Sequence, residues 1–187
     1  HVEVEWFIHL CERDAVPGVR PLTADEVALL RGIPAGFDAA GIAEHAAIEK
    51  VTVHDVKAVE YYIKRRLEGT SLAPLSELTH FACTSEDINN LSYALMVKGA
   101  VEDVWLPAAT ALVGDVAELA RAAKGTPMLS RTHGQTATPT TLGKEFAVLA
   151  HRLGRQLRRV EAQEYLGKIN GATGTFGAHS AAVPGTD

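Results

Sequence analysis

The sequence predicts an all-α protein built as an elongated helix bundle, and the spacing of its apolar residues is the main reason. Apolar side chains recur at steps of three and four along most of the chain, as they do on one face of a helix. Only the opening VEVEW alternates in the way a half-buried strand does. Long helical patterns separated by sizeable connections favour an elongated bundle over a compact α/β domain.

Three segments carry the clearest helical pattern. The segment Gly143–Leu166 has one apolar stripe with basic residues on its other faces, and Thr138-Pro139 offers an N-cap residue followed by a proline suited to the first turn. A second helix is expected over about Ser85–Arg121, where Pro107 should kink or split it. A third helix should span roughly His54–Leu67, which ends just before a glycine.

The remaining chain gives weaker signals of its organisation. A short helix is expected within Pro17–Pro34, between proline, glycine and arginine breakers. The SLAPLSE stretch, near Ala73-Pro74, is the expected domain boundary. The chain opens on His1 and closes on AAVPGTD without a helix cap or a polar tail. We therefore expect it to be a piece of a longer protein, cut at both ends.

Composition excludes several classes of protein. The 187 residues are 47% hydrophobic and 22% charged, with a mean hydropathy of +0.03, which is typical of a globular chain rather than a disordered one. No apolar run approaches the roughly 18–20 residues of a membrane helix, and no secretory signal pattern opens the chain. A formal net charge of −5 argues against a protein that holds nucleic acid by its phosphates. Cys11 and Cys83 suit a reducing compartment better than a disulfide framework.

Basic residues gather in one part of the chain. Nine of the eighteen lysines and arginines lie between Arg121 and Lys168. They could form a solvated helix face, or a surface that meets an anionic ligand or an acidic neighbouring subunit.

The segment Ser130–Thr140, SRTHGQTATPT, is the densest cluster of polar residues. We expect it to be a loop, made rigid by Pro139, that presents His133. Histidine titrates near neutral pH and is therefore suited to proton transfer. The alternative is a histidine that only satisfies backbone groups. The neighbouring glutamine and threonines could hold a ligand carboxylate.

Two further segments are expected at helix N-termini. Thr84 and Asp87 have the spacing of a capping box, and free N–H groups at such an end attract a carboxylate or a phosphate. His54 and Asp55 open another helix. In each case an ordinary cap or a surface residue is the alternative to a ligand contact.

Other kinds of site are unsupported by the sequence. No histidine pair has i, i+4 spacing with a nearby glutamate, and the two cysteines are far apart, so we expect no metal site. There is no GxGxxG, Walker or GxSxG motif. The glycine-rich LGKINGATGTFG follows a helix rather than a strand, so it predicts a loop with close backbone approaches.

Four of these segments together resemble a known family. THFACTSEDINN and SRTHGQTATPTTLGKE are similar to the first two signature regions of the fumarase/aspartase superfamily. VHDVKAVEYYIK and LGKINGATG narrow the resemblance to the adenylosuccinate lyases of the bacterial type, over nearly the whole chain. The superfamily's third signature, a serine-rich loop of the form SSxMPxKxNP, is absent, and so is an early Arg-Tyr phosphate-binding segment. Val53 stands where an asparagine or another polar residue is expected, although its backbone could still contact a ligand.

The resemblance implies the architecture of the whole protein. It implies an all-α subunit of three domains, of which residues 1–73 are part of the N-terminal helical domain. Residues 74–187 would be the first part of the central helix bundle, truncated here. Four bundles would pack into a cytoplasmic homotetramer whose sites each draw on three subunits. The family uses no metal and no organic cofactor, and no nucleic acid or membrane partner is expected.

The resemblance also implies a reaction. Adenylosuccinate lyases cleave adenylosuccinate to AMP and fumarate, and SAICAR to AICAR and fumarate, by β-elimination in purine biosynthesis. His133 matches the general acid, whereas the general base is a serine on the absent loop, so the isolated chain should be inactive. Lys57 is a weaker candidate for a substrate contact. The residues that match substrate contacts are Val53, His54, Asp55, Thr84, Ser85, Thr132 and Gln135.

Two alternatives remain open at this point. One is a sibling lyase, such as argininosuccinate lyase or a carboxymuconate cycloisomerase, against which the HDVKAVE and KINGATG segments argue. The other is a helical assembly module without turnover.

Overall fold

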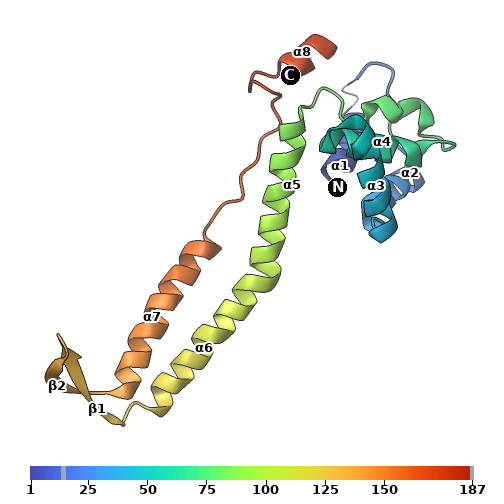
Figure 1. The fold of residues 1–187 in the computed structure, drawn as a ribbon. Helices are drawn as coiled ribbons and strands as arrows, with labels where there is room; N and C mark the ends of the chain where they lie inside the picture. Colours follow the sequence, from blue (N-terminus) through green and yellow to red (C-terminus); the bar gives the residue numbers. More distant parts are fainter. Residues whose placement is uncertain (14–15, 186–187) are drawn as a thin grey trace. The chain divides into compact units, whose positions relative to one another are not determined.

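A computed structural model describes residues 1–13 and 16–185 of the chain, and these fall into two compact units. The described parts of residues 1–94 and 166–187 form the first unit, and residues 95–165 form the second. Both are mainly helical, and the described residues contain one small sheet of two strands (Figure 1). The all-α prediction is therefore confirmed. The division near Ala73 into two domains stays a prediction.

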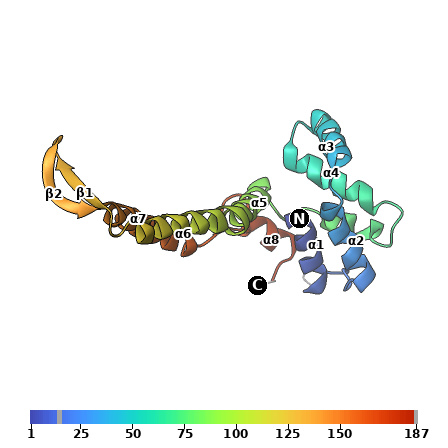
Figure 2. The ribbon, with the colours of Figure 1, turned by 90° about the horizontal axis from the view of Figure 1, so that it is seen from below.

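The first unit is made of short helices and the start of a long one. Its elements are α1 (Val2–Glu12), α2 (Ala24–Ala35), α3 (Ala39–Thr52), α4 (Asp55–Leu67), the 3-10 helix η1 (Ala73–Leu78), the first part of α5 (Ser85–Gly99) and α8 (Gly177–Ala182). Within this unit α1 lies against α2, and α3 lies against α4 (Figure 2). The predicted helices at Pro17–Pro34 and His54–Leu67 are thus present as α2 and α4.

The opening VEVEW is helical, so the strand-like alternation was misleading. Val4, Phe7, Ile8 and Cys11 lie at steps of three, four and seven, and all four are buried. They form the core of the first unit with apolar residues from α2, α4 and η1. The longer helical period therefore outweighs a five-residue alternation.

The second unit begins within α5. It continues with a π-helix, η2 (Ala100–Trp105), then α6 (Leu106–Ala122), the strands β1 (Pro127–Thr132) and β2 (Gln135–Thr141), and α7 (Leu142–Glu161). The helix expected over about 85–121 is therefore present, but no loop splits it at Pro107. Proline has no N–H to donate to the carbonyl four residues earlier. The π-helix accommodates the missing donor within a continuous helix. Just before the proline, the Leu106 N–H bonds Val101 O, five residues earlier rather than the four of an α-helix.

The segment expected as a loop is a β-hairpin. Thr132 pairs with Gln135, and the two residues between them, His133 (φ 51°) and Gly134 (φ 78°), are both left-handed. Two left-handed residues between antiparallel strands make a tight turn of the type favoured in hairpins. The polar segment is therefore held by main-chain pairing rather than by a rigid loop.

The start of α7 also differs from the prediction. Pro139 lies in β2 opposite Leu129, and Thr141, not Thr138, is the N-cap, because its side chain accepts the Lys144 N–H. The helix ends at Glu161 rather than at Leu166. Its second residue, Gly143, lies so close to the end of α6 that a Cβ would collide with Ala120 O and with the backbone of Lys124, just after the helix. This close approach sets how α6 and α7 pack.

Candidate active site

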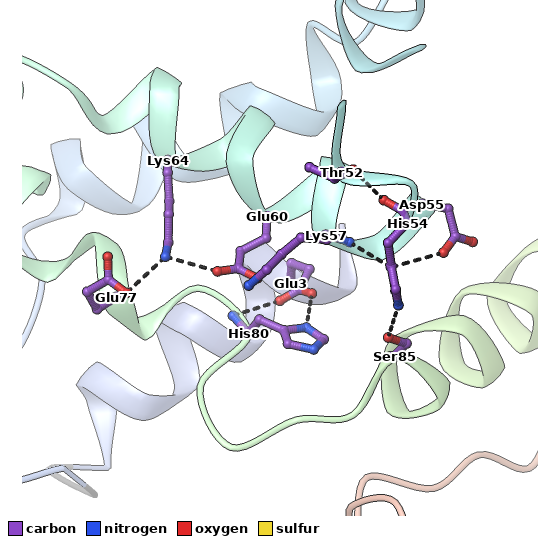
Figure 3. Close-up of polar contacts among 10 residues, drawn as sticks. All are labelled: Glu3, Thr52, His54, Asp55, Lys57, Glu60, Lys64, Glu77, His80 and Ser85. Carbon is purple, nitrogen blue, oxygen red and sulfur yellow. Dashed lines mark hydrogen bonds and ion pairs between the residues drawn. The ribbon is translucent and has the colours of Figure 1, made fainter. Parts of the chain in front are cut away.

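His54 and Ser85, from two different helix starts, meet in the first unit (Figure 3). His54 is the N-cap of α4, with an extended backbone, and its Nδ1 accepts the Lys57 N–H at 3.2 Å. Because Nδ1 is an acceptor, the proton of the neutral ring resides on Nε2. Nε2 lies 3.2 Å from Ser85 Oγ, so the ring donates to the serine hydroxyl.

The turn between α3 and α4 sets the direction of His54. Val53 is the C-cap of α3 and is left-handed (φ 53°), and its N–H bonds Glu49 O at 2.7 Å. This conformation is rare for a β-branched residue and signals local strain. Asp55 Oδ1 lies 3.4 Å from His54 Nδ1 and accepts the Val56 N–H at 2.8 Å. The predicted contacts Val53, His54 and Asp55 thus form one tight turn.

The other side of this site is the N-terminus of α5. Thr84 and Ser85 are half-buried there, and Asp87 Oδ2 accepts the Thr84 N–H at 2.9 Å. This is the carboxylate half of the capping box that the spacing predicts. The segment leading into it contains two left-handed residues, His80 (φ 63°) and Ala82 (φ 58°), which turn the chain sharply before Thr84.

A buried carboxylate holds that turn in place. Glu3 from α1 is only 1% exposed, and it accepts the His80 N–H at 3.0 Å and pairs with His80 Nδ1 at 2.6 Å (Figure 3). The hydrogen bond to Glu3 raises the pKa of His80, against the opposing effect of burial. Sequence reasoning missed this pair, because the two residues are far apart in the chain and no local spacing connects them.

Lys57, the weaker candidate, is paired elsewhere. Its Nζ lies 2.7 Å from Glu60 Oε2, and the same buried carboxylate also binds Lys64 at 2.9 Å (Figure 3). Burial acts to raise the pKa of Glu60, but the two ammonium groups together lower it. The charge of Lys57 is therefore largely balanced within α4.

The remaining predicted residues belong to the second unit. Thr132, His133 and Gln135 lie at the tip of the β1–β2 hairpin, and all three are exposed. His133 and Gly134 form the turn itself, so the imidazole projects from a left-handed backbone position. The structure thus groups Val53, His54, Asp55 and Ser85 in one unit and the hairpin residues in the other.

Within residues 1–13 and 16–185, no group of three or more metal-binding side chains is arranged to hold a metal ion. No helix in the same ranges combines the length and the apolar character needed to cross a bilayer. Cys11 and Cys83 are free thiols, and burial raises the pKa of Cys11 to about 11 and that of Cys83 to about 12. Both therefore stay protonated near neutral pH and are unsuited to nucleophilic chemistry.

Comparison with known families gives a direct match. A family model described as "Lyase" matches residues 2–185. The chain belongs to this lyase family. Over all 187 residues this lyase chain is 46% identical to the adenylosuccinate lyase of Haemophilus influenzae and 48% identical to that of Escherichia coli K12. In both cases the chain spans 41% of the relative's length.

Two solved structures share the fold of this chain. The lyase chain is similar to a fumarate lyase from Mesorhizobium sp. BNC1 (TM-score 0.74, 21% identity, 97% of this chain and 41% of that one). It is also similar to the 3-carboxy-cis,cis-muconate lactonizing enzyme from Pseudomonas putida (TM-score 0.72, 22% identity, 97% and 40%). These likenesses show the fold, which is mainly helical as expected.

Proposed function

We propose that this chain is part of an adenylosuccinate lyase. The protein would cleave adenylosuccinate to AMP and fumarate, and SAICAR to AICAR and fumarate, in purine biosynthesis. The observation that carries this proposal is the 46–48% identity to adenylosuccinate lyases across the whole chain. The aligned region covers all 187 residues and therefore includes every segment that carries a proposed site residue.

The reaction is a β-elimination that needs an acid and a base. A base removes a proton from the Cβ of the succinyl group, the C–N bond breaks, and a C=C bond forms to give fumarate. His133 is the proposed general acid, which delivers its proton to the departing nitrogen. The base is proposed to be a serine on a segment outside this chain. Thr132 and Gln135, beside His133 on the hairpin, are proposed to contact the same substrate.

The N-terminus of α5 is suited to the charge that develops. Removal of the Cβ proton places negative charge on the adjacent carboxylate, which is stabilised by donors already in position. The Nε2–H of His54 donates to Ser85 Oγ, so the serine hydroxyl proton can be directed at a carboxylate oxygen. Thr84 precedes Ser85 at the same helix end, whose dipole also favours an anion. Val53 and Asp55 are proposed to line the nucleotide side of this site.

A homotetramer is part of the same proposal. Several large apolar residues of the second unit are exposed in the single chain, and exposed apolar surface on this scale is typical of an interface. They lie on α5, η2 and α6: Leu95, Met96, Val97, Val104, Trp105, Leu112 and Leu119. Residues 1–73 and 74–187 would then belong to the N-terminal domain and the central bundle. We also propose a cytoplasmic location, because the proposed function rests on identity to enzymes of purine biosynthesis.

The test is fumarate release by the full-length protein that contains this chain. We expect turnover of adenylosuccinate and SAICAR, and none of argininosuccinate. Turnover of argininosuccinate alone would replace the proposal with the sibling lyase. No turnover of any of the three by a folded tetramer would favour an assembly module. The isolated 187-residue chain, assayed in parallel, should release no fumarate, because the base is missing.

A further inference from the structure

A buried carboxylate on α5 joins two segments of the first unit that are far apart in sequence. Asp87 is fully buried, with none of its surface exposed. Besides the Thr84 N–H, it accepts hydrogen bonds from the main-chain N–H groups of Asn170 (3.1 Å) and Gly171 (3.1 Å to Oδ2). The ammonium of Lys168 lies 2.7 Å from its Oδ1. The N-terminus of α5 and the segment 168–171 are therefore held by one side chain.

Asn90, one helical turn later, reinforces the same connection. Its Oδ1 accepts the Lys168 N–H at 2.8 Å, and its Nδ2 donates to Lys168 O at 3.0 Å. The amide thus pairs with the main chain of Lys168 in both directions, as a neighbouring strand would. Gly167 permits this approach, since a Cβ there would collide with the Leu91 side chain. Gly171 (φ 82°) supplies the left-handed turn that aims its N–H at Asp87.

The charge on Asp87 is part of the arrangement. Burial acts to raise the pKa of Asp87, but the Lys168 ammonium and the N–H groups of Thr84 and Gly171 outweigh it and lower the pKa. Lys168 Nζ also donates to Gly171 O at 2.8 Å. The Lys168 ammonium is only half-buried, but without it the fully buried Asp87 carboxylate would have no opposite charge to pair with.

We propose that Asp87 is a positioning residue for the carboxylate-binding hydroxyls of Thr84 and Ser85. By joining Thr84 to the segment 168–171, its side chain fixes the main chain from which both hydroxyls project. This inference rests on the proposed function, because it assumes that these hydroxyls bind a substrate carboxylate. A small displacement of such groups lowers the rate steeply, by as much as about 100-fold for a shift of about 1 Å.

The test is Asp87→Asn in the full-length enzyme. Asparagine has a similar size, but its NH₂ group would face the donors of Lys168 and Gly171, so the Thr84 turn should shift. We expect kcat/KM for adenylosuccinate to fall about 10- to 100-fold, through a lower kcat and a higher KM, because the hydroxyls bind the substrate carboxylate and stabilise the charge that develops on it. Inhibition by fumarate, which presents the same carboxylate, should weaken by a similar factor.

Glu26→Gln is the matched control. Glu26 is also a buried carboxylate of the first unit, and it binds Arg20, the Ser71 hydroxyl and the Thr23 N–H, away from the candidate site. The Glu26→Gln variant should lose thermal stability as Asp87→Asn does. Its KM for adenylosuccinate and its inhibition by fumarate should stay at the wild-type values. If the two variants have the same kinetics once compared at temperatures where both are folded, Asp87 has only a structural role and the inference is wrong.

A second pair of variants covers the case in which Asp87→Asn does not fold. Lys168→Met removes the charged partner of Asp87, whereas Lys168→Arg keeps the charge. We expect Lys168→Met to raise KM for adenylosuccinate as Asp87→Asn does. Lys168→Arg should keep KM much closer to the wild-type value. Equal kinetics for both would overturn the inference.

Amide exchange gives a readout that does not depend on activity. Peptides covering residues 79–90 and 166–176 should exchange faster together in Asp87→Asn, and not in Glu26→Gln. If the wild-type enzyme fails to cleave adenylosuccinate, the proposed function fails, yet this joint response still tests the connection. Independent exchange of the two peptides would refute it.

Discussion

The two groups of proposed site residues, one in each unit, are held in opposite ways. In the first unit, His54 and Ser85 contact each other and are supported by buried carboxylates: Glu3 orders the turn before Thr84, and Asp87 holds its N–H. In the second unit, Thr132, His133 and Gln135 lie at an exposed hairpin tip. Within the described ranges of the chain, main-chain pairing of β1 and β2 is what orders that tip.

This difference teaches how function and stability should separate. Substitutions around His54 and Ser85 change groups that also support the fold, so their effects on activity and stability should rise together. Substitutions at the hairpin tip change side chains that touch little within their own unit, so activity should fall with almost no loss of stability. Each of the following predictions tests one side of this contrast.

The largest effect is expected at His133. In the full-length enzyme, His133→Asn should lower turnover by about 10²–10⁴, as is typical for loss of a general acid. Asparagine tolerates the left-handed backbone of this turn, so the hairpin should keep its geometry. The melting temperature should stay at the wild-type value. Steady-state fumarate release and thermal melting are the two measurements, and wild-type turnover would remove His133 from the catalytic role.

The next prediction tests whether His54 and His133 of one site come from different subunits. His54→Asn keeps an N-cap residue on α4 but loses the imidazole that reaches Ser85, so this variant should also be weakly active. If each site takes His54 and His133 from different chains, refolding an equal mixture with His133→Asn leaves about a quarter of sites intact in a randomly mixed tetramer. Fumarate release should therefore rise well above either parent. Hybrid tetramers without any recovery would mean that both histidines come from one chain.

The sequence allowed α2, α4, α5, α6 and α7 to be predicted, because helical spacing or helix breakers mark their segments. It did not predict α3 or α8, and in α1 a five-residue alternation obscured the buried helical stripe. The hairpin was missed because Thr-Pro is compatible with a helix start, whereas here Pro139 lies in a strand. His-Gly is also not one of the dipeptides that usually signal a two-residue turn.

The supports of the site could not be predicted for a different reason. Asp87 meets Lys168 and Glu3 meets His80 through pairs separated by 81 and 77 positions. Local spacing predicts a cap for Asp87, and that part was right, since it accepts the Thr84 N–H. Local spacing carries no information on a partner from a distant segment, because only the packed fold brings that segment near.

A smaller effect is expected from the pH dependence of the His80–Glu3 pair. Glu3 raises the pKa of His80 above its ordinary value of 6.5, so the protonated form is favoured in the folded state. The stabilisation is complete below pH 6.5 and is lost as the pH rises through the raised pKa. The melting temperature of the wild-type protein should therefore fall as the pH rises from 6.5 through the raised pKa of His80. His80→Asn, which tolerates the left-handed backbone, should remove that fall, and an unchanged slope would contradict the assignment.

The smallest effect, and the only gain, is expected at Val53. Its side chain is 87% exposed, yet its backbone is left-handed, which a β-branched residue adopts only under strain. Asparagine is favoured in this conformation, so Val53→Asn should raise the free energy of unfolding by about 1 kcal/mol.

Val51→Asn is the matched control, because Val51 is also exposed, at 83%, but lies within α3. Asparagine and valine have similar helix propensities, so this control should change stability by less than about 0.5 kcal/mol. Denaturant unfolding of the full-length protein distinguishes the two, and equal changes would mean that the turn before His54 stores no strain.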